Sequence, residues 1–214
     1  MRDSVKAELR REGRARRRRY QGADRVRSES SICAHILHAP QLREVIKSGK
    51  LIGAYLAFDG EVSLATLWGG EAHPVWSRDD LTHRDSSSSE DEEITSRLRD
   101  LLVFPRHKPG QALSFVRPDR WVGSGPLPLP EGPIVSLESV GALLIPGVWF
   151  EPHRGGRIGL GGGHYDRTLA LRAETSWSAL CFGVGFTFQM RPDLPLDPWD
   201  VFLDGIFTER GLIE

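Results

Sequence analysis

The chain has 214 residues, of which 39% are apolar and 27% charged. These values fit one soluble layered domain with its own core, and they exclude a collagen, a wholly disordered chain and a membrane-spanning protein. The net charge of −1 is unevenly distributed: residues 1–27 hold eleven Lys or Arg and four Asp or Glu, so this arm carries +7 and the remainder −8. A basic arm predicts an anionic partner, and nucleic acid, a membrane surface and a nucleotide polyphosphate all remain open.

The two cysteines, Cys33 and Cys181, show no spacing typical of a metal site. Buried thiols in a reducing compartment are therefore expected. The N-terminus has no apolar segment like that of a secretory signal, and no apolar run reaches the length of a membrane span. We expect a cytoplasmic protein.

The first half of the chain predicts mainly helices. Residues 3–20 have the pattern of a basic helix, which Gly13 should weaken and in which the run Arg16–Arg19 is too charged to enter the core. A second helix is expected over residues 24–48, interrupted at Pro40.

Between these helices and the middle of the chain, the apolar run 51–58 predicts a buried strand, and residues 62–69 predict the start of a helix. Residues 71–93 contain a serine-rich acidic tract, which we interpret as a flexible surface insertion, with a phosphorylated acidic segment as the alternative.

The second half alternates between short strands and helices. In chain order the expected elements are a helix at 94–100, strands at 101–104 and 113–116, a loop at 123–133, a strand at 140–145, a helix ending near 173, and strands at 180–186 and 201–207. This alternation predicts an α/β fold whose sheet is at least partly parallel.

The strongest local signal is a glycine loop formed by Gly159 and Gly161–Gly163, which lies between an expected strand and an expected helix. Glycines let the backbone approach an anion, and the N–H groups of a helix N-terminus favour negative charge. Arg157 at the entrance of the loop is placed to pair with phosphate oxygens. The spacing matches neither a Walker motif nor a dinucleotide fingerprint, so a simple tight turn is the alternative.

Several charged residues are further candidates for the site. Asp166 directly follows the loop and is either a Mg²⁺ ligand or a helix N-cap. Asp200 and Asp204 are further candidate Mg²⁺ ligands. Lys6 and Arg10 share one helix face, which suits an anion that bridges them, although a solvated basic helix is the simpler alternative.

Seven motifs follow one another along the chain. They are Lys6–Arg10 (KAELR), Tyr55–Val62 with Glu61 in a Gly-Glu-Val turn, Phe104–Arg106, Leu144–Phe150 with its Pro-Gly pair, Arg157–Arg167, Phe186–Gln189, and Asp200–Asp204 with Thr208-Glu209. In this series the chain resembles the 5-formyltetrahydrofolate cyclo-ligase family, also called 5,10-methenyltetrahydrofolate synthetases. The glycine motif is specific, whereas the others are persuasive only together.

The resemblance implies a single domain over residues 1–214 with a NagB/RpiA/CoA-transferase-like three-layer α/β sandwich and a mostly parallel mixed sheet. It implies an enzyme that uses ATP and Mg²⁺ to convert 5-formyltetrahydrofolate to 5,10-methenyltetrahydrofolate, with release of ADP and phosphate, through a phosphorylated formyl intermediate. The folate, with or without a polyglutamate tail, and ATP would be its partners. We expect a monomer or weak homodimer with no membrane or nucleic-acid partner.

The resemblance also implies roles for particular residues. Leu56, Glu61 and His164 would bind the folate, while Asp166 and Asp204 would hold Mg²⁺. Arg157 would be catalytic. The ATP phosphates would be bound by Lys6, Arg10, Arg157, Ile158, Gly159, Leu160, Gly161, Gly162, Gly163, His164 and Tyr165.

Some residues depart from the family pattern. His164 stands where the family often has Tyr, the stretch Leu127–Glu131 matches loosely, and Trp121 is expected to pack rather than to contact the pterin. The run Arg16–Arg19 has no family counterpart. A non-catalytic homologue that binds nucleotide or RNA through the arginine arm is therefore the alternative, and a sugar-phosphate isomerase would rest on fold analogy alone.

Overall fold

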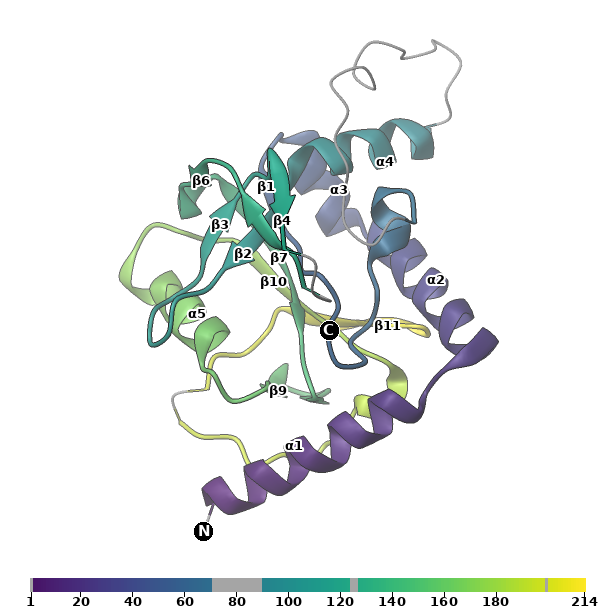
Figure 1. Cartoon of the computed structure of the whole chain (residues 1–214), viewed down its shortest axis with the longest axis vertical. Coiled ribbons are helices and arrows are strands. Elements are labelled where there is room, and N and C mark those ends of the chain that lie inside the picture. Colours follow the sequence, from purple (N-terminus) through teal and green to yellow (C-terminus); the bar gives the residue numbers. More distant parts are fainter. Residues whose placement is uncertain (1, 71–89, 124–126, 199) are drawn as a thin grey trace.

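A central sheet of eight strands organises the molecule, in the order β12-β11-β10-β7-β1-β2-β3-β6. The computed structural model describes residues 2–70, 90–123, 127–198 and 200–214. Helices α2, α3 and α4 lie on one side of the sheet, α5 lies on the other, and α1 crosses below them (Figure 1). The predicted α/β class with helices on both faces is confirmed.

The helices are α1 (Arg2–Arg19), α2 (Gly22–His38), α3 (Pro40–Lys47), α4 (Glu90–Leu101) and α5 (His164–Glu174). Short 3-10 turns lie at Ala65–Trp68, Leu137–Ser139 and Thr187–Gln189. The strands of the main sheet are β1 (Leu51–Gly53), β2 (Leu102–Arg106), β3 (Ser114–Val116), β6 (Ile134–Val135), β7 (Val140–Pro146), β10 (Leu180–Val184), β11 (Gly205–Thr208) and β12 (Gly211–Ile213). Two separate hairpins pair β4 (Arg120–Val122) with β5 (Leu129–Glu131) and β8 (Trp149–Glu151) with β9 (Gly156–Ile158).

The middle of the sheet is parallel and buried on both faces. Strands β2, β1, β7, β10 and β11 pair in parallel, whereas β3, β6 and β12 pair antiparallel at the two edges. Along β7, Ala142 and Leu144 join the core cluster that contains α2, while Leu143 and Ile145 join the cluster that contains α5. This burial explains why the parallel strands are continuous apolar runs in the sequence.

The strand order reverses direction between β1 and β7. From β1 the chain builds outward through β2, β3 and β6, and then it returns to β7 on the other side of β1 and builds outward through β10 to β12. In open α/β sheets, ligands bind beyond the carboxyl ends of the strands at such a point. The topology therefore places a crevice next to Gly53 and Pro146.

Most expected elements are present, and the differences have local causes. The helix break at Pro40 is confirmed, and the two strands expected at 101–104 and 113–116 are present as β2 and β3, which pair with each other. The expected strand 51–58 ends at Gly53, because the following residues turn away to line a cavity. The segment 123–133 was expected to be only a loop, but it contains β5, which pairs with β4 through Pro130 opposite Trp121.

The expected insertion at 71–93 lies largely outside the described residues, which omit 71–89. Its last part is helical, because α4 begins at Glu90 rather than at residue 94. Four acidic residues in the first turn of α4 interact favourably with the helix dipole. Arg43 of α3 forms ion pairs with Glu90 and Asp91, so this acidic turn is held on the neighbouring helix.

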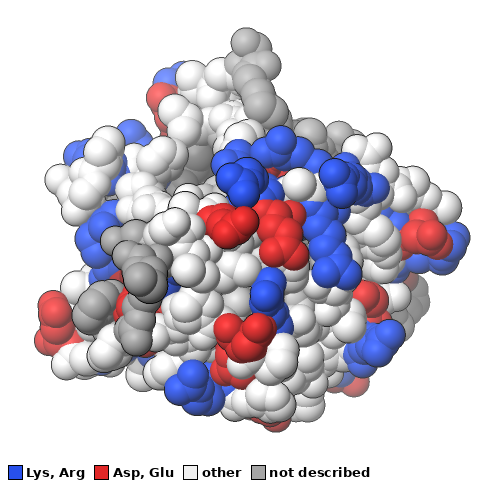
Figure 2. All heavy atoms as spheres, turned by 90° about the horizontal axis from the view of Figure 1, so that it is seen from below, with Lys and Arg blue, Asp and Glu red and all other residues white. Residues whose placement is uncertain are grey.

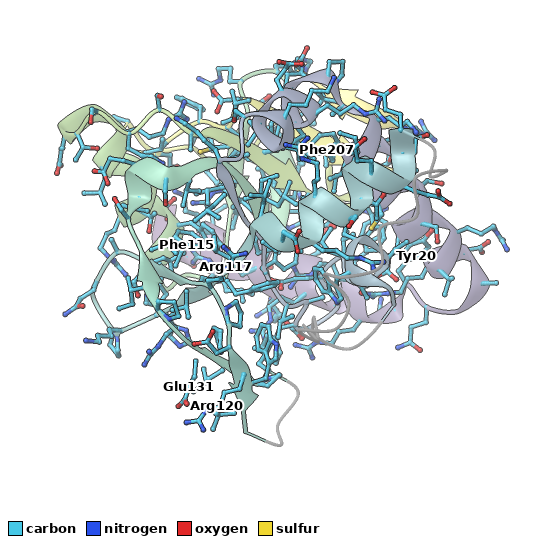
Figure 3. All side chains as sticks on the ribbon, turned by 90° about the horizontal axis from the view of Figure 1, so that it is seen from above. Tyr20, Phe115, Arg117, Arg120, Glu131 and Phe207 are labelled. Atoms are coloured by element: carbon cyan, nitrogen blue, oxygen red, sulfur yellow. The ribbon has the colours of Figure 1, made fainter. Side chains whose placement is uncertain are left out.

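The β4–β5 hairpin projects from the body of the molecule, with Arg120 and Glu131 side by side on it (Figure 3). Arg120 Nη2 lies 2.6 Å from Glu131 Oε2. Trp121, on the opposite face of this strand, packs edge-on against Phe104 with 5.1 Å between ring centroids. The packing role expected for Trp121 is therefore observed. Within the described part of the chain, no helix is long and apolar enough to cross a membrane.

The expectation that Arg16–Arg19 stays out of the core is wrong for one residue. Arg17 is 0% exposed, because it lies on the face of α1 that packs on the rest of the protein. Its guanidinium Nη1 donates a 2.9 Å hydrogen bond to Gly147 O and lies near the carboxylates of Asp59 and Glu61. A buried arginine is tolerated when opposite charges and hydrogen-bond acceptors surround it.

Gly13 does not break α1 but lets it approach the β8 hairpin closely. A Cβ at this position would lie 2.5 Å from Val148 Cγ1 and 2.6 Å from Trp149 Nε1, and both side chains are buried. The indole Nε1 of Trp149 also donates a 2.7 Å hydrogen bond to Leu9 O on the preceding turn of α1. The glycine therefore permits the contact that positions the helix.

Gly13→Ala should destabilise the protein by about 1–3 kcal/mol, because overpacking outweighs the gain of about 1 kcal/mol in helix propensity. Urea denaturation measures this change in the free energy of unfolding. As a control in the same helix, Ala15→Gly should cost only the propensity difference of about 1 kcal/mol. A Gly13→Ala variant more stable than wild type would contradict the close packing.

Candidate functional site

A cavity of about 310 Å³ lies beyond the carboxyl ends of β1, β2 and β7. The chain after β1 contributes Tyr55 to Glu61, the end of β2 contributes Pro105 and His107, and the end of β7 contributes Pro146 and Gly147. The cavity thus occupies the crevice that the reversal of strand order predicts.

The glycine loop forms one wall of this cavity. All residues from Arg157 to Asp166 line it. Gly161 and Gly163 have φ values of +102° and +64°, a conformation that favours glycine, and Gly163 is the N-cap of α5 with no side-chain capping bond. The wall therefore combines a glycine turn with a helix N-terminus, which is the arrangement expected for an anion site.

Arg157 is held at the base of the loop. Its side chain is only 4% exposed, and its Nη2 lies 2.6 Å from Asp166 Oδ1. Its Nε is buried and has no hydrogen-bond partner within the described residues. An unpartnered donor on an arginine that lines a cavity is available for a bound anion.

Helix α1 closes the cavity with two cations. Lys6 and Arg10 both line it, as the shared helix face predicts. Lys6 Nζ lies 2.5 Å from Asp197 Oδ2 and 3.1 Å from Asp200 Oδ2, and Arg10 Nε donates to Gly159 O at 3.1 Å. Burial acts to lower the pKa of Lys6, but the hydrogen bonds to the two aspartates outweigh it and raise the pKa. Lys6 is therefore charged, and its repulsion with Arg10 is already offset by carboxylates.

The candidate metal ligands separate into two groups. Asp166 and Asp200 line the cavity, and the N-cap alternative for Asp166 is wrong because Gly163 occupies that position. Asp204 does not line the cavity. Its carboxylate accepts a 2.7 Å hydrogen bond from Cys181 N and pairs with Arg172 at 3.2 Å, which ties α5 to β10.

The position of Asp204 therefore does not support the expectation that it is a Mg²⁺ ligand. Asp200, four residues earlier, does line the cavity. The described residues contain no group of three or more His, Cys, Asp or Glu arranged to hold a metal ion. Asp166 and Asp200 could still hold Mg²⁺, because this ion is commonly bound by one or two carboxylates together with substrate phosphates and water.

The segment after β1 forms another part of the cavity wall. Leu56 and Glu61 line it as predicted, together with Tyr55 and Phe58. Glu61 is 7% exposed and accepts a 3.0 Å hydrogen bond from Phe58 N. Burial raises the pKa of Glu61 from its ordinary value of 4.5 to about 7, and the nearby charge of Arg17 only partly opposes this shift. The cavity therefore holds a carboxyl group that changes charge near neutral pH.

His164 lies at the start of α5 and lines the cavity, as predicted. Its ring lies 5.4 Å from that of His107, and its Nδ1 lies 3.2 Å from Gln111 O. Burial raises the pKa of the adjacent Tyr165, so its hydroxyl stays neutral. Two imidazoles thus stand where the loop meets the end of β2.

Sequence reasoning missed several lining residues. These are Tyr55, Phe58, Pro105, His107, Leu113, Leu127, Pro146 and Gly147. A usable signal exists for Pro105, His107, Pro146 and Gly147, because they end or directly follow parallel strands. Leu113 and Leu127 come from loops that only the tertiary structure brings to the cavity.

The titration of Glu61 has a consequence for stability. The folded protein binds a proton on Glu61 that the unfolded chain releases above pH 4.5, so this contribution is fully present below pH 4.5 and is lost as pH rises through about 7. Compared with Glu61→Gln, which cannot titrate, wild type should lose about 3 kcal/mol of unfolding free energy between pH 4.5 and 8. Denaturation curves across this range test the prediction, and parallel pH profiles of the two proteins would contradict it.

Comparison with known proteins agrees with the resemblance. The model of the 5-formyltetrahydrofolate cyclo-ligase family matches residues 119–209, which include the glycine loop, Asp166 and Asp200. A Haemophilus influenzae protein named 5-formyltetrahydrofolate cyclo-ligase is 26% identical over 181 residues, 85% of each chain.

Two solved structures have the same fold. The NMR structure of Aquifex aeolicus 5,10-methenyltetrahydrofolate synthetase superposes with a TM-score of 0.68 at 26% identity, over 97% of this chain and 91% of that chain. The 5,10-methenyltetrahydrofolate synthetase from Mycoplasma pneumoniae gives a TM-score of 0.65 over 95% of this chain and 98% of that chain, and at 19% identity it supports the fold alone. In its motifs, its fold and these matches, the chain is thus similar to the 5-formyltetrahydrofolate cyclo-ligases.

Proposed function

We propose that this chain, as a single domain over residues 1–214, is a 5-formyltetrahydrofolate cyclo-ligase that forms 5,10-methenyltetrahydrofolate with ATP and Mg²⁺. The observation that carries the proposal is the composition of one cavity. Its glycine loop, Arg157, Lys6 and Arg10 form an anion-binding side, and Leu56 and Glu61 form an apolar side with one carboxyl group. A reaction between a polyphosphate and a flat heterocycle needs these two sides next to each other.

The ATP phosphates are proposed to lie along the glycine loop. The backbone from Ile158 to Tyr165 and the N-terminus of α5 supply N–H groups, and Arg157 and Arg10 supply guanidinium donors. Lys6 adds a positive charge from α1. Phosphoryl transfer depends mainly on positioning and charge neutralisation, so such a set of groups suffices without a protein nucleophile.

Two carboxylates that line the cavity fit a magnesium ion. Asp166 is 47% exposed and Asp200 lies next to Lys6, so both combine access to the cavity with nearby cations that balance their charge. When bound there, Mg²⁺ would neutralise and orient the phosphate oxygens. The two aspartates would hold it, while Arg157 fixes the orientation of Asp166 through its 2.6 Å contact.

The folate is proposed to lie against Leu56, Glu61 and His164. The pteridine ring carries adjacent N–H donors, and an ionised Glu61 carboxylate is an acceptor for them. Because the pKa of Glu61 is about 7, this acceptor is fully formed only above neutral pH in the free protein. Binding of an N–H donor favours the ionised form, so the folate and the charge of Glu61 should be coupled.

The proposed reaction balances as follows. The formyl oxygen on N5 attacks the γ-phosphorus of ATP, ADP leaves, and the carbon becomes electrophilic as a phosphorylated imidate. N10 then attacks this carbon, its proton is lost to solvent, and the carbon–oxygen bond breaks so that the formyl oxygen leaves in inorganic phosphate. Arg157 is the proposed catalytic residue, because its guanidinium can stabilise charge on the transferred phosphoryl group.

The alternative, nucleotide or RNA binding through the arginine arm, finds less support in the side-chain contacts. Arg14 and Arg18 both bind Asp59, Arg25 pairs with Glu29, and Arg27 pairs with Asp24. Viewed from the α1 side, Lys/Arg and Asp/Glu lie in adjacent blocks (Figure 2). A non-specific nucleic-acid site needs a continuous set of free cations.

Arg157→Ala should reduce kcat/KM at least about a hundredfold, because it removes the main cation of the phosphate side. The near-ultraviolet absorbance of methenyltetrahydrofolate, followed with both substrates present, measures the rate. Arg154→Ala is the matched control, since Arg154 lies in the same hairpin, is largely exposed and pairs with Glu151 outside the cavity. Wild type that binds ATP but forms no product would refute the proposed function.

The two groups of aspartates predict different defects. Asp166→Asn and Asp200→Asn should each raise the Mg²⁺ concentration for half-maximal rate by about tenfold or more, because each loses a charged ligand. Asp204→Asn should leave that concentration unchanged and lower the melting temperature, since its carboxylate only holds Arg172 and Cys181. A raised Mg²⁺ requirement in Asp204→Asn, with none in Asp166→Asn and Asp200→Asn, would contradict this assignment and favour Asp204 as the metal ligand.

A further inference from the structure

Arg17 is a fully buried charged side chain that the proposed chemistry does not use. It is 0% exposed, whereas Arg18, the next residue in α1, is more than half exposed. Arg17 does not line the cavity, and no family motif contains it. Burying a guanidinium is unfavourable unless its charge and its donors are met, so its position requires an explanation.

The contacts of Arg17 lead to two segments that do line the cavity. Its Nη1 donates a 2.9 Å hydrogen bond to Gly147 O and lies 3.8 Å from Glu61 Oε1. Its Nη2 lies 3.7 Å from Asp59 Oδ2. One guanidinium therefore joins α1, the turn at 59–61 and the turn at the end of β7.

Neutralising Asp59 does not explain the burial of Arg17. Asp59 already accepts hydrogen bonds of 2.5 Å from Arg14 Nε and from Arg18 Nε. In contrast, among the described residues Arg17 is the cation that forms an ion pair with the Glu61 carboxylate, whereas Arg25 donates to the Glu61 carbonyl oxygen. The charge of Arg17 therefore acts on Glu61 through an ion pair at 3.8 Å, while Phe58 N donates to the other carboxylate oxygen of Glu61.

The two turns that contact Arg17 pack closely around it, so its side chain has little room to move. Gly60, between the two carboxylates, has a φ of +80°, and a Cβ there would lie 3.0 Å from the backbone of Arg17. Gly147 O is held from the other side by the buried Gln189, whose Nε2 donates to it at 2.8 Å. The guanidinium is consequently held between two fixed turns.

We infer that Arg17 is a positioning residue for the folate side of the cavity: anchored on Gly147 O, it orients the Glu61 carboxylate and favours its ionised form. This inference rests on the proposed function, because it assumes that Glu61 accepts hydrogen bonds from the substrate. Arg17 touches no substrate itself. It also makes the folate side depend on the same helix that supplies Lys6 and Arg10 to the phosphate side.

Other titratable groups lie near Arg17 and Glu61. Asp59 raises the pKa of Glu61, whereas Arg17 lowers it. Tyr55 and Tyr165 also face Glu61, and burial raises the pKa of both, so neither changes charge near neutral pH. Near neutral pH, removal of Arg17 should therefore appear as an upward shift in the titration of Glu61.

The first test compares Arg17→Gln with Arg18→Gln, which removes a neighbouring arginine that binds the same Asp59. Arg17→Gln should raise KM for the folate by about ten- to a hundredfold, as expected when a charge-assisted hydrogen bond loses its geometry, and should change KM for ATP less than twofold. Arg18→Gln should change neither by more than about twofold. Equal losses for both variants, or an unchanged folate KM in Arg17→Gln, would overturn the inference.

The second test needs no catalysis, so it separates this inference from the proposed function. The Glu61 carboxyl is titrated by NMR in protein carrying ¹³C-labelled glutamate and is assigned with Glu61→Gln. Its midpoint should rise in Arg17→Gln and stay in place in Arg18→Gln. An unchanged midpoint in Arg17→Gln would overturn the inference even if the enzyme is active, and a raised midpoint would support it even if wild type lacks the proposed activity.

A double variant covers the case in which Arg17→Gln folds poorly. Arg17→Gln/Glu61→Gln removes both buried charges together, so it should be more stable than Arg17→Gln alone. If Arg17 acts through Glu61, the double variant should have the same folate KM as Glu61→Gln within about twofold. A further tenfold increase would contradict an effect transmitted through Glu61.

Discussion

The burial of a positively charged helix face against the carboxyl end of a parallel sheet is the constraint on which the site depends. Helix α1 is a basic segment that would gain little from packing on an apolar surface. It is held instead by specific contacts: Gly13 permits close approach to the β8 hairpin, Trp149 donates to Leu9 O, and Arg17 is surrounded by Asp59, Glu61 and Gly147 O. These contacts fix the helix in a position from which Lys6 and Arg10 line the same cavity as the glycine loop.

The opposed charges of the arm and the body are therefore largely complementary within the molecule. Residues of the arm form ion pairs with Asp59, Asp197 and Asp200 of the body, so opposite charges within the molecule contribute to the net charge of −1. The same match prepares the cavity for its proposed ligands, because cations are held near carboxylates before a polyphosphate arrives. Preorganised charges of this kind cost little reorganisation when a charged ligand binds.

The sequence predicted the parts of the site that depend on local patterns. The glycine loop needs strand, glycines and helix in succession, and the pair Lys6 and Arg10 needs only helical spacing. Asp200 and Asp204 could not be separated, because the segment before β11 has no periodic pattern that tells which carboxylate points to the cavity.

Arg17 was missed although a signal existed: Lys6, Leu9, Gly13 and Arg17 follow one helical stripe, and all four are buried. Because Arg17 lies in a run of four arginines, the charge of the run concealed that one of them continues the buried face of the helix. The short strands β5, β8 and β12 depend on tertiary pairing and lacked a signal of their own.

The central claim is that one cavity joins a phosphate side to a folate side so that ATP activates the formyl oxygen directly. The fate of that oxygen is the most direct measurement. With 5-formyltetrahydrofolate labelled with ¹⁸O in the formyl group, mass spectrometry should find one ¹⁸O atom in each phosphate released. Release of unlabelled phosphate, with the label in water, would contradict the account.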